Sequence, residues 1–280
     1  MTPGTLFLVA TPIGNLEDLT MRAVRVLKEV DVIACEDTRH TRGLLEAYTI
    51  QTSVVSYHEH NEQRRAPELI RRLLAGDSVA LVADAGMPVL SDPGYTLLRQ
   101  AIEHGIPVVA IPGPSAITTA VAVSGLPPDR FLFCGFLPRR SAERRRALAE
   151  LAPLPATLVI FEGPHRIEAA LVDLLAVLGN RRVALVRELT KRFEEVVRGT
   201  ASEVLEHVRL APPRGEITVV IEGVTADQPA SARPPDVTAH LKELLASGTS
   251  AKDAVQVVAQ TYRLPKRTVY RLALDVLEKR

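Results

Sequence analysis

Short apolar runs recur along the first 110 residues and alternate with stretches of helical periodicity. The runs are rich in β-branched and aliphatic residues, each is followed by a turn rich in Pro, Gly or Asp, and they cover residues 6–11, 31–35, 79–84 and 107–111. Nearly continuous apolar runs are typical of strands buried in a parallel sheet. Between them lie helical stripes at 19, 23, 26 and 27 and at 70, 73 and 74. Strands that alternate with helices predict an α/β unit with right-handed crossovers.

A second set of the same elements follows residue 130. Further apolar runs cover 131–136, 157–161, 183–187, 196–199 and 217–222, with helical periodicity at about 142–151, 166–178 and 201–209. Residues 112–128 begin and end with Pro and Gly and enclose one helix of small residues, which is typical of a bridge between domains. We therefore expect two α/β lobes, at 1–112 and 113–224.

The pattern changes again after residue 223. Residues 225–235 are rich in Ala, Pro and polar residues without a sustained apolar period, and predict a linker. Beyond it, apolar stripes at 251–262 and 269–277 are separated by Leu264 and Pro265, which predicts a helix-turn-helix pair in a domain at 236–280. Residues 250–280 hold seven Lys or Arg and three acids. That basic tail, with Lys266 and Arg267, favours contact with a phosphate backbone, although a solvated pair that caps the main body fits equally well.

Composition narrows the class of protein. Hydrophobic residues make up 46% and charged residues 24%, as in ordinary globular proteins. The net charge is only +1, so nucleic-acid binding would have to rest on local basic patches. Two cysteines, Cys35 and Cys134, exclude a disulfide framework and favour a reducing, cytoplasmic location. No apolar stretch reaches the length of a membrane span, and no signal peptide is expected.

The loops after the predicted strands are the first candidates for chemistry. No phosphate-binding G-x-x-x-x-G-K-[ST] or dinucleotide-binding G-x-G-x-x-G motif is present. Residues 83–94 and 111–116 are nevertheless rich in Gly, Pro, Asp and Ser, and such loops let a ligand approach the backbone. In parallel sheets the ligand lies at the carboxyl ends of the strands, where both loops fall. Turn formation alone would also explain either loop.

Two polar clusters also follow predicted strands. Glu36, Asp37 and Arg39 come after the run at 31–35, and His58 and His60 would share one face of an extended segment. Zinc sites need three or four ligands, so we expect no metal here. Carboxylates and histidines suit general acid and base catalysis. Polar surface filler remains an alternative.

Arginines form a third cluster. Residues 139–146 contain five of them, among them Arg139, Arg140 and Arg144, offset only by Glu143. Such a cluster at the start of a helix is a candidate phosphate-binding surface, although charge runs are commonly just solvated. Arg166 closes a further loop, at 162–166, where Pro near the first turn of a helix leaves backbone N–H groups free to face the crevice.

Taken together, these motifs resemble the class III, tetrapyrrole methylase-like S-adenosylmethionine methyltransferases. The resemblance is colinear from about residue 5 to 224, and it rests on residues 9–20, 35–39, 57–61, 83–94, 111–116, 162–166, 187–191 and 214–223. The Pro-Ile-Gly-Asn sequence at 12–15 and the Glu-Asp-Thr-Arg sequence at 36–39 resemble the branch that methylates the 2'-oxygen of a cytidine in 16S rRNA. The C-terminal helical pair is also similar to that branch.

The resemblance implies two α/β lobes of the tetrapyrrole methylase type, S-adenosylmethionine in the cleft between them, and a homodimer. The residues implied to contact the cofactor are Pro12, Gly14, Asp84, Ala85, Gly86, Met87, Ser91, Asp92, Ser115 and Ala116, with Gly163, Leu189 and Gly215 from the second lobe. Glu36, Asp37 or His58 would take or orient the ribose proton, while Arg39 would steer phosphate. Arg139, Arg140, Arg144, Arg166, Lys266 and Arg267 would bind 16S rRNA or the small ribosomal subunit.

Two other functions compete with this interpretation. One is a methyltransferase of the same fold that acts on a tetrapyrrole or another small molecule. Only 4% of the residues are aromatic and none is Trp, which offers little surface for a flat macrocycle. The other is a non-catalytic ribosome-assembly factor that binds RNA, and measurable cofactor binding would argue against it.

Overall fold

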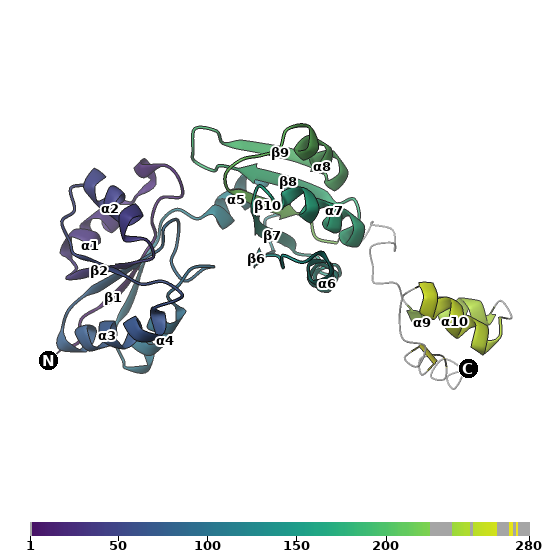
Figure 1. Ribbon diagram of the computed structural model, residues 1–280, viewed down its shortest axis with the longest axis horizontal. Helices are drawn as coiled ribbons and strands as arrows, with labels where there is room; N and C mark the ends of the chain where they lie inside the picture. Colours follow the sequence, from purple (N-terminus) through teal and green to yellow (C-terminus); the bar gives the residue numbers. More distant parts are fainter. Residues whose placement is uncertain (1, 225–236, 247–248, 262–268, 271–272, 274–280) are drawn as a thin grey trace.

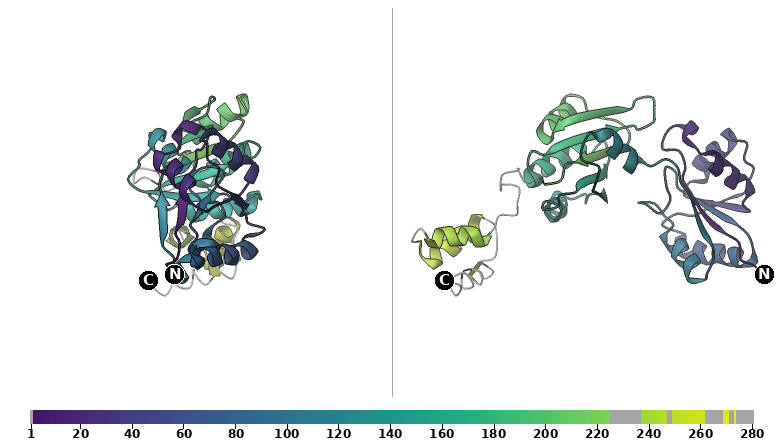
Figure 2. Two further views of the ribbon diagram at one scale, coloured as in Figure 1. Left: turned by 90° about the vertical axis from the view of Figure 1, so that its left-hand side faces the viewer. Right: turned by 180° about the vertical axis from the view of Figure 1, so that it is seen from behind.

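Two α/β lobes and a helical segment follow one another along the chain (Figure 1). The computed structural model describes residues 2–224, 237–246, 249–261, 269–270 and 273. The view from behind shows the same succession, with the first sheet and the helices α9 and α10 at opposite ends (Figure 2). None of the helices in these described ranges is long and apolar enough to cross a membrane.

The first lobe is built on a parallel sheet. Its strands are β1 (Leu6–Val9), β2 (Val32–Cys35), β3 (Val54–Ser56), β4 (Val79–Val82) and β5 (Val108–Ile111). They lie in the order β3-β2-β4-β1-β5, and each pairing is parallel. The near-continuous apolar runs in the sequence are explained by this arrangement, because both faces of the central strands are covered. The predicted parallel α/β unit is confirmed.

Side-chain alternation gives the first sheet two separate cores. Leu6, Leu8 and Leu81 face one side, where α3 (Glu62–Ala75) and α4 (Tyr95–Glu103) pack. Val9 and Ile33 face the other side, against α1 (Met21–Glu29) and α2 (Thr38–Ala47). The strands therefore hold their carboxyl ends at one edge, and the helices leave that edge to loops.

The second lobe contains a mixed sheet. Its strands are β6 (Phe131–Phe136), β7 (Thr157–Glu162), β8 (Arg182–Arg187), β9 (Glu195–Thr200) and β10 (Ile217–Ile221), in the order β6-β7-β10-β8-β9. β6 and β7 are parallel, whereas β10 runs antiparallel to both β7 and β8. The beginning of β10 consequently lies beside the carboxyl ends of β7 and β8. All five strands were predicted from the sequence, but their directions were not.

Helices cover both faces of the second sheet. One face carries α6 (Ser141–Leu151), α7 (Ile167–Leu178) and α8 (Ala201–Leu210) over Leu158 and Leu185. The other carries α5 (Ala116–Ser124), whose Ile117 and Val121 pack on Val159. The helix in the predicted bridge therefore packs on the second sheet, and the chain passes between the two sheets once, at residues 112–115. The lobe boundary at 112–113 stays a prediction.

The C-terminal segment forms a small helical core of its own. α9 (Val237–Ala246) and α10 (Ala251–Thr261) pack together, and Leu241, Val258, Val269 and Ala273 share one apolar cluster. The stripe that begins at 251 was predicted, whereas α9 was not singled out within the predicted helical domain. Lys266, Arg267 and the predicted linker at 225–235 lie outside the described residues.

A buried arginine joins three segments of the second lobe. Arg181 is 1% exposed, and its guanidinium donates to the carbonyls of Leu178 (3.1 Å), Glu222 (3.3 Å) and Ala152 (2.7 Å). Leu178 is the last residue of α7, and Ala152 and Glu222 directly follow α6 and β10. The guanidinium thus satisfies buried polar groups that secondary structure leaves unpaired.

Replacing Arg181 by Met should destabilise the protein. Met keeps much of the volume but leaves the three carbonyls without donors, so we expect the free energy of unfolding to fall by about 3 kcal/mol. Urea denaturation measures this loss. Arg182→Met, which changes the exposed neighbouring arginine, is the matched control. Equal urea midpoints for the two variants would show that the hydrogen bonds of Arg181 contribute no stability.

Candidate active site

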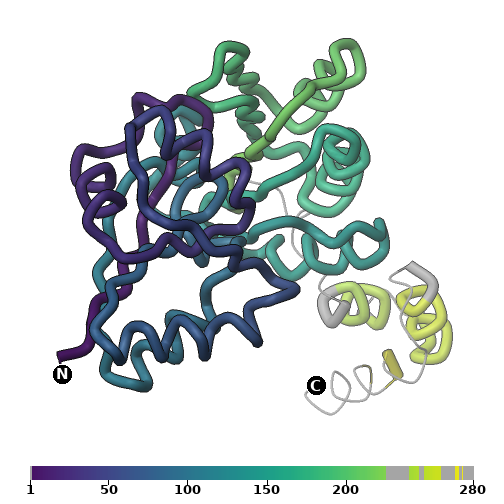
Figure 3. Tube along the Cα trace, turned by 60° about the vertical axis from the view of Figure 1, so that its left-hand side comes forward, coloured from purple at the N-terminus to yellow at the C-terminus, as the bar shows by residue number. Residues whose placement is uncertain are grey.

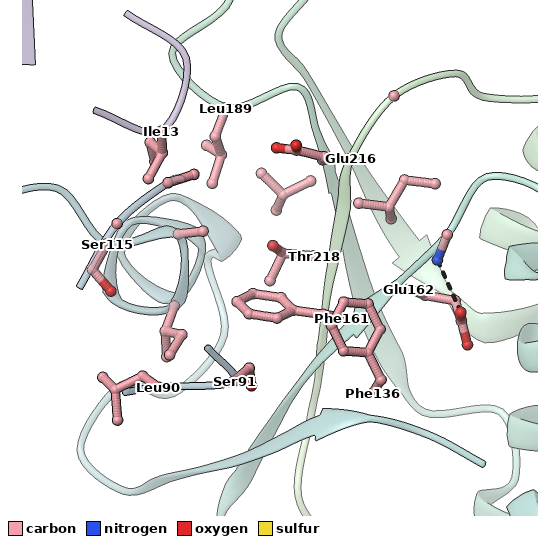
Figure 4. A pocket seen from close by; sticks show the side chains of 18 of the residues that line it. Ile13, Leu90, Ser91, Ser115, Phe136, Phe161, Glu162, Leu189, Glu216 and Thr218 are labelled. Atoms are coloured by element: carbon pink, nitrogen blue, oxygen red, sulfur yellow. Dashed lines mark hydrogen bonds between the residues drawn. The ribbon is translucent and has the colours of Figure 1, made fainter. Parts of the chain in front are cut away.

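A cavity of about 340 Å³ opens between the two lobes. Its walls come from the loops after β1, β4 and β5 in the first lobe, and from the ends of β6, β7 and β8 and the start of β10 in the second (Figure 4). Figure 3 shows the purple-to-blue trace of the first lobe beside the teal-to-green trace of the second. The cavity therefore lies between the carboxyl ends of the first-lobe strands and the end of the second sheet where β6, β7 and β8 finish and β10 begins.

The first-lobe wall depends on a bridge between two loops. The backbone of Thr11 exchanges two hydrogen bonds with Gly86, at 2.9 and 3.1 Å, and the buried Thr11 hydroxyl donates to the carbonyl of Ala83 at 3.0 Å. Gly86 has a φ of 82°, a conformation that favours glycine. Val89 (φ 79°) and Ser91 (φ 66°) adopt similar angles without being glycine. This loop is therefore held in a strained shape beside the cavity.

The second-lobe wall is fixed by charges. Lys191 Nζ lies 2.9 Å from a Glu188 oxygen and 3.1 Å from a Glu216 oxygen. The Glu216 backbone N–H and the Lys191 side chain lower the pKa of Glu188. A Cβ on Gly215, whose φ is 83°, would lie 2.1 Å from Glu188 Oε1, so this position requires glycine.

The two walls touch at Gly14. A Cβ there would lie 2.3 Å from Lys191 Cγ, so the loop after β1 in the first lobe packs directly on the stem of a second-lobe side chain. Lys191 thus contacts the first lobe with its methylenes and the carboxylates of the second lobe with its ammonium group. This contact joins the two lobes next to Ile13, which lines the cavity.

Most residues implied to contact the cofactor do line the cavity. Ten of the thirteen are in its wall: Ala85, Gly86, Met87, Ser91, Asp92, Ser115, Ala116, Gly163, Leu189 and Gly215. Pro12, Gly14 and Asp84 are not part of the lining. For all thirteen residues, contact with a cofactor stays a prediction.

Other lining residues were missed by sequence reasoning. They are Leu90, Ile117, Phe136, Phe161, Glu162, Pro164, Val186, Glu216, Ile217 and Thr218, whereas Ile13 belongs to the loop at 12–14 that the resemblance implies. Five of them are apolar residues in strands or helices, and such residues cannot be told from core residues in a sequence: Ile117, Phe136, Phe161, Val186 and Ile217. Glu162 carried a usable signal, because a carboxylate at the end of an apolar run is unusual. Its Oε1 accepts from the Gly163 N–H at 2.9 Å (Figure 4).

The predicted catalytic residues lie next to the cavity rather than in its lining. Glu36 and Asp37 follow β2, and the Asp37 N–H donates to Asp84 Oδ1 at 3.2 Å. Asp92, which does line the cavity, has its pKa raised to about 6 by burial and by the charges of Glu36 and Asp84. The acidic group around Glu36 is therefore connected to the cavity electrostatically through Asp92.

The members of this group have different environments. Burial and the charge of Asp84 raise the pKa of Glu36. The Arg39 N–H, which donates to Asp37 at 2.8 Å, lowers the pKa of Asp37, and the exposed Arg39 side chain pairs with the same carboxylate at 3.4 Å. Asp37 thus caps α2 and stays ionised, whereas Glu36 holds its proton more tightly.

The two histidines after β3 differ in their exposure to solvent. His58 is half-buried and His60 is exposed, and their ring centroids lie 6.0 Å apart at an angle of 68°. The His58 Nδ1 atom is buried without a hydrogen-bond partner. No group of three potential ligands occurs among the described residues. His58 remains a candidate for proton transfer because its charge acts on Glu36.

The structure corrects part of the predicted RNA surface. Arg139 and Arg140 are exposed, as predicted. Arg144 is only 4% exposed and pairs with Asp173 at 2.6 Å, so its assignment as an RNA contact is wrong. Arg166 is also held within the protein, since it pairs with Glu162 at 3.1 Å and donates to the Leu137 carbonyl at 2.6 Å. Both side chains hold the lobe together.

Comparison with known proteins places this fold and cavity in a family. The family model described as Tetrapyrrole (Corrin/Porphyrin) Methylases matches residues 5–205. The chain belongs to the tetrapyrrole methylase family. A second model, the RsmI C-terminal HTH domain, matches residues 231–276 of this methylase, which supports the predicted helix-turn-helix.

Several curated relatives of this methylase share one name. A protein of Halalkalibacterium halodurans called "Ribosomal RNA small subunit methyltransferase I" is 48% identical over 96% of this chain and 94% of its own length. Proteins of the same name from Micromonospora olivasterospora (46% identical; 95% and 85%) and Synechocystis (43%; 98% and 98%) also match. The similarity covers lobes and tail alike, and identity at this level shows that the chain is a methyltransferase.

Solved structures agree on the fold. Uroporphyrin III C-methyltransferase from Thermus thermophilus matches with a TM-score of 0.55 and 22% identity, over 78% of this chain and 97% of its own. Diphthine synthase matches with a TM-score of 0.60 and 17% identity, over 79% and 91%. At this level of identity the likeness shows the fold alone.

Replacing Asp92 by Asn should stabilise this methylase at neutral pH. The pKa of Asp92 lies above its ordinary 3.8, so the folded state binds the proton more tightly than the unfolded chain and wild-type stability falls as pH rises from 3.8 to about 6. We expect Asp92→Asn to raise the free energy of unfolding by about 1 kcal/mol at pH 7, after allowance for solvent screening, and to change it little near about pH 3. Denaturant titrations at both pH values measure this, with Asp129→Asn, at an exposed carboxylate, as the control. A pH-independent difference would contradict the expectation.

Proposed function

We propose that this methylase transfers a methyl group from S-adenosylmethionine to the ribose 2'-oxygen of a cytidine in the 16S rRNA of the small ribosomal subunit. One observation carries the proposal: a cavity shared by both lobes is lined by ten of the thirteen residues that the family resemblance assigns to the cofactor. The names of the curated relatives support rRNA as the substrate. They favour it over a tetrapyrrole.

The cavity suits S-adenosylmethionine in shape and charge. Gly86, Ser115 and Gly163 leave the backbone accessible, while Ile13 and Leu189 supply apolar walls for an adenine ring. The carboxylate of Asp92, ionised above its pKa of about 6, would face the positively charged ligand. When bound, the cofactor supplies an electrophilic methyl group on a sulfonium. The protein's main task is then to align the ribose oxygen with that methyl group.

A ribose hydroxyl is a weak nucleophile, so a nearby base has to accept its proton. Glu36 fits this role better than Asp37, because its pKa is raised toward the working pH while the Asp37 carboxylate caps a helix and binds Arg39. His58 lies close enough for its charge to influence Glu36. We assign proton acceptance to Glu36 assisted by His58, and phosphate steering to the exposed Arg39.

The RNA would follow a path from the cavity toward exposed arginines. Arg139 and Arg140 come three and four residues after Phe136, which lines the cavity, and they are exposed before the start of α6. Their charges suit the phosphates that flank the target nucleotide. The C-terminal helical domain would provide a second contact with the RNA. These proposals place the protein in the cytoplasm, where ribosomes are found.

We also propose that the active form is a homodimer. β5 and β6 are edge strands of their sheets. Apolar side chains on both are exposed, with Val109 40%, Phe131 42% and Leu132 39% accessible to solvent. Exposed apolar edges of this kind favour pairing with another copy of the chain.

A methyl-transfer assay tests the function. The protein is incubated with radiolabelled S-adenosylmethionine and with small ribosomal subunits from cells that lack its gene. We expect label on a cytidine 2'-oxygen, and a turnover about 10²- to 10⁴-fold lower for Glu36→Gln, because loss of a positioned base costs this much. Glu59→Gln, at an exposed neighbouring carboxylate, should retain full turnover. Calorimetry with S-adenosylhomocysteine should show unchanged binding in both variants.

Two outcomes would contradict these assignments. Binding of S-adenosylhomocysteine without label on subunits or naked rRNA would move the proposal to a small-molecule substrate. Label on the cytidine with full turnover in Glu36→Gln, Asp37→Asn and His58→Ala would keep the function but exclude all three residues as the base.

Removal of the basic surfaces should weaken RNA binding without affecting the cofactor. We expect deletion of residues 236–280, and separately Arg139→Ala with Arg140→Ala, to raise KM for the subunits. The slope of log affinity against log salt should fall by roughly 0.7 for each lost phosphate contact. Arg25→Ala with Arg99→Ala changes two exposed arginines of the first lobe and serves as the control. Variants that are as active and as salt-sensitive as wild type would show that these surfaces do not bind RNA.

A further inference from the structure

One aromatic side chain of the cavity is unusually exposed. The chain contains six Phe, five Tyr and no Trp, and two Phe residues, Phe136 and Phe161, line the cavity. Phe136 is 58% exposed although it lies in the cavity wall. An apolar ring left open at a cavity typically marks a surface that a ligand covers.

A local distortion of β6 places this ring. The register between β6 and β7 shifts between Phe133 and Phe136, and Gly135 has a φ of 63°. Irregularities of this kind re-aim side chains next to active sites. A Cβ on Gly135 would lie 3.6 Å from Ser91 Oγ, so this bend lies close to the first-lobe loop that carries Asp92.

Other aromatic rings hold Phe136 from within the lobe. Its centroid lies 5.6 Å from that of Phe161, at an angle of 59° (Figure 4). The centroid of Phe161 in turn lies 4.9 Å from that of Phe133. The ring is therefore supported on the protein side and open on the other. Leu90, which is 50% exposed, belongs to the first-lobe wall of the same cavity.

We propose that Phe136 is the platform on which the base of the methylated nucleotide stacks. The inference rests on the proposed function and names how the nucleotide is held. Stacking of an unpaired base on an aromatic side chain is a common mode of RNA recognition.

The charges nearby select the base rather than the phosphates. Asp92 in the cavity wall and Glu36 beside it are acidic and would repel a phosphate brought close to them, whereas the exposed Arg39, Arg139 and Arg140 lie outside the lining and would attract phosphates there. A base on Phe136 places its own ribose close to Asp92 and Glu36, with the flanking phosphates near Arg139 and Arg140. Recognition of the base and positioning of the ribose thus become one event.

Steady-state kinetics with small subunits tests this role. We expect Phe136→Ala to raise KM for the subunits about 5- to 150-fold, the range found when a base loses its aromatic partner. Phe136→Tyr should restore most of the affinity, and Phe136→Leu should not, because a base stacks on a flat ring. Phe193→Ala removes another exposed ring of the second lobe, outside the cavity lining, and should behave as wild type.

The absence of Trp from the chain allows a direct probe. Phe136→Trp creates a single-tryptophan protein, and stacking of a base should quench its fluorescence. With the cofactor site saturated by S-adenosylhomocysteine, we expect quenching by an oligocytidylate RNA. Phe193→Trp, outside the cavity lining, should show none.

Three results would overturn the inference. If Phe136→Ala abolishes binding of S-adenosylhomocysteine, or if that molecule alone quenches Phe136→Trp, the ring covers the cofactor instead. If the wild type methylates subunits and Phe136→Ala does so with unchanged KM, Phe136 does not hold the substrate. Failure of the wild type to methylate any subunit is a different result, which refutes the proposed function itself.

Discussion

The site depends on the pairing of two loops, the one after β1 with the one after β4, through Thr11 and Gly86. Thr11 is 1% exposed, so its hydroxyl and backbone groups have no access to water and must be satisfied by the second loop. That requirement places Ile13 and the residues from Ala85 to Asp92 on one wall. Because β1 and β4 are neighbours in the centre of the first sheet, the cores on both faces hold the two loops in register.

The lobes support strain that the loops could not sustain alone. Val89, Ser91, Glu188 and Thr190 are non-glycine residues with positive φ, and they lie in the two loops that form opposite walls of the cavity. Each such residue costs on the order of 1–3 kcal/mol. Four central strands of the two sheets, β1, β4, β8 and β10, are almost wholly buried and anchor these loops. The buried strands thus hold two strained loops in place.

Much of this fold could be predicted from the sequence, because buried strands and amphipathic helices leave local patterns. The direction of β10 could not, since it depends on pairing with β7 and β8 rather than on the strand itself. The burial of Arg144 could not be predicted either. Its neighbours Arg140 and Arg145 are exposed to solvent, whereas Arg144 is buried because it pairs with Asp173 on another helix. Glycine-rich loops pointed to the cavity, whereas Phe136 was hidden among strand residues. Small and polar residues in the loops of the cavity could be recognised in the sequence, whereas the apolar residues of its lining could not.

The single passage of the chain between the lobes, at residues 112–115, gives the cavity a role in folding. Each lobe has its own cores, and the two lobes are joined by this short connection, by Ile13, which packs in a second-lobe core, and by contacts such as that of Gly14 with Lys191. A ligand that touches both walls binds only when both halves are folded and apposed. By mass action it then adds its binding free energy to the whole and not to either half. Such a ligand would couple the unfolding of one lobe to that of the other.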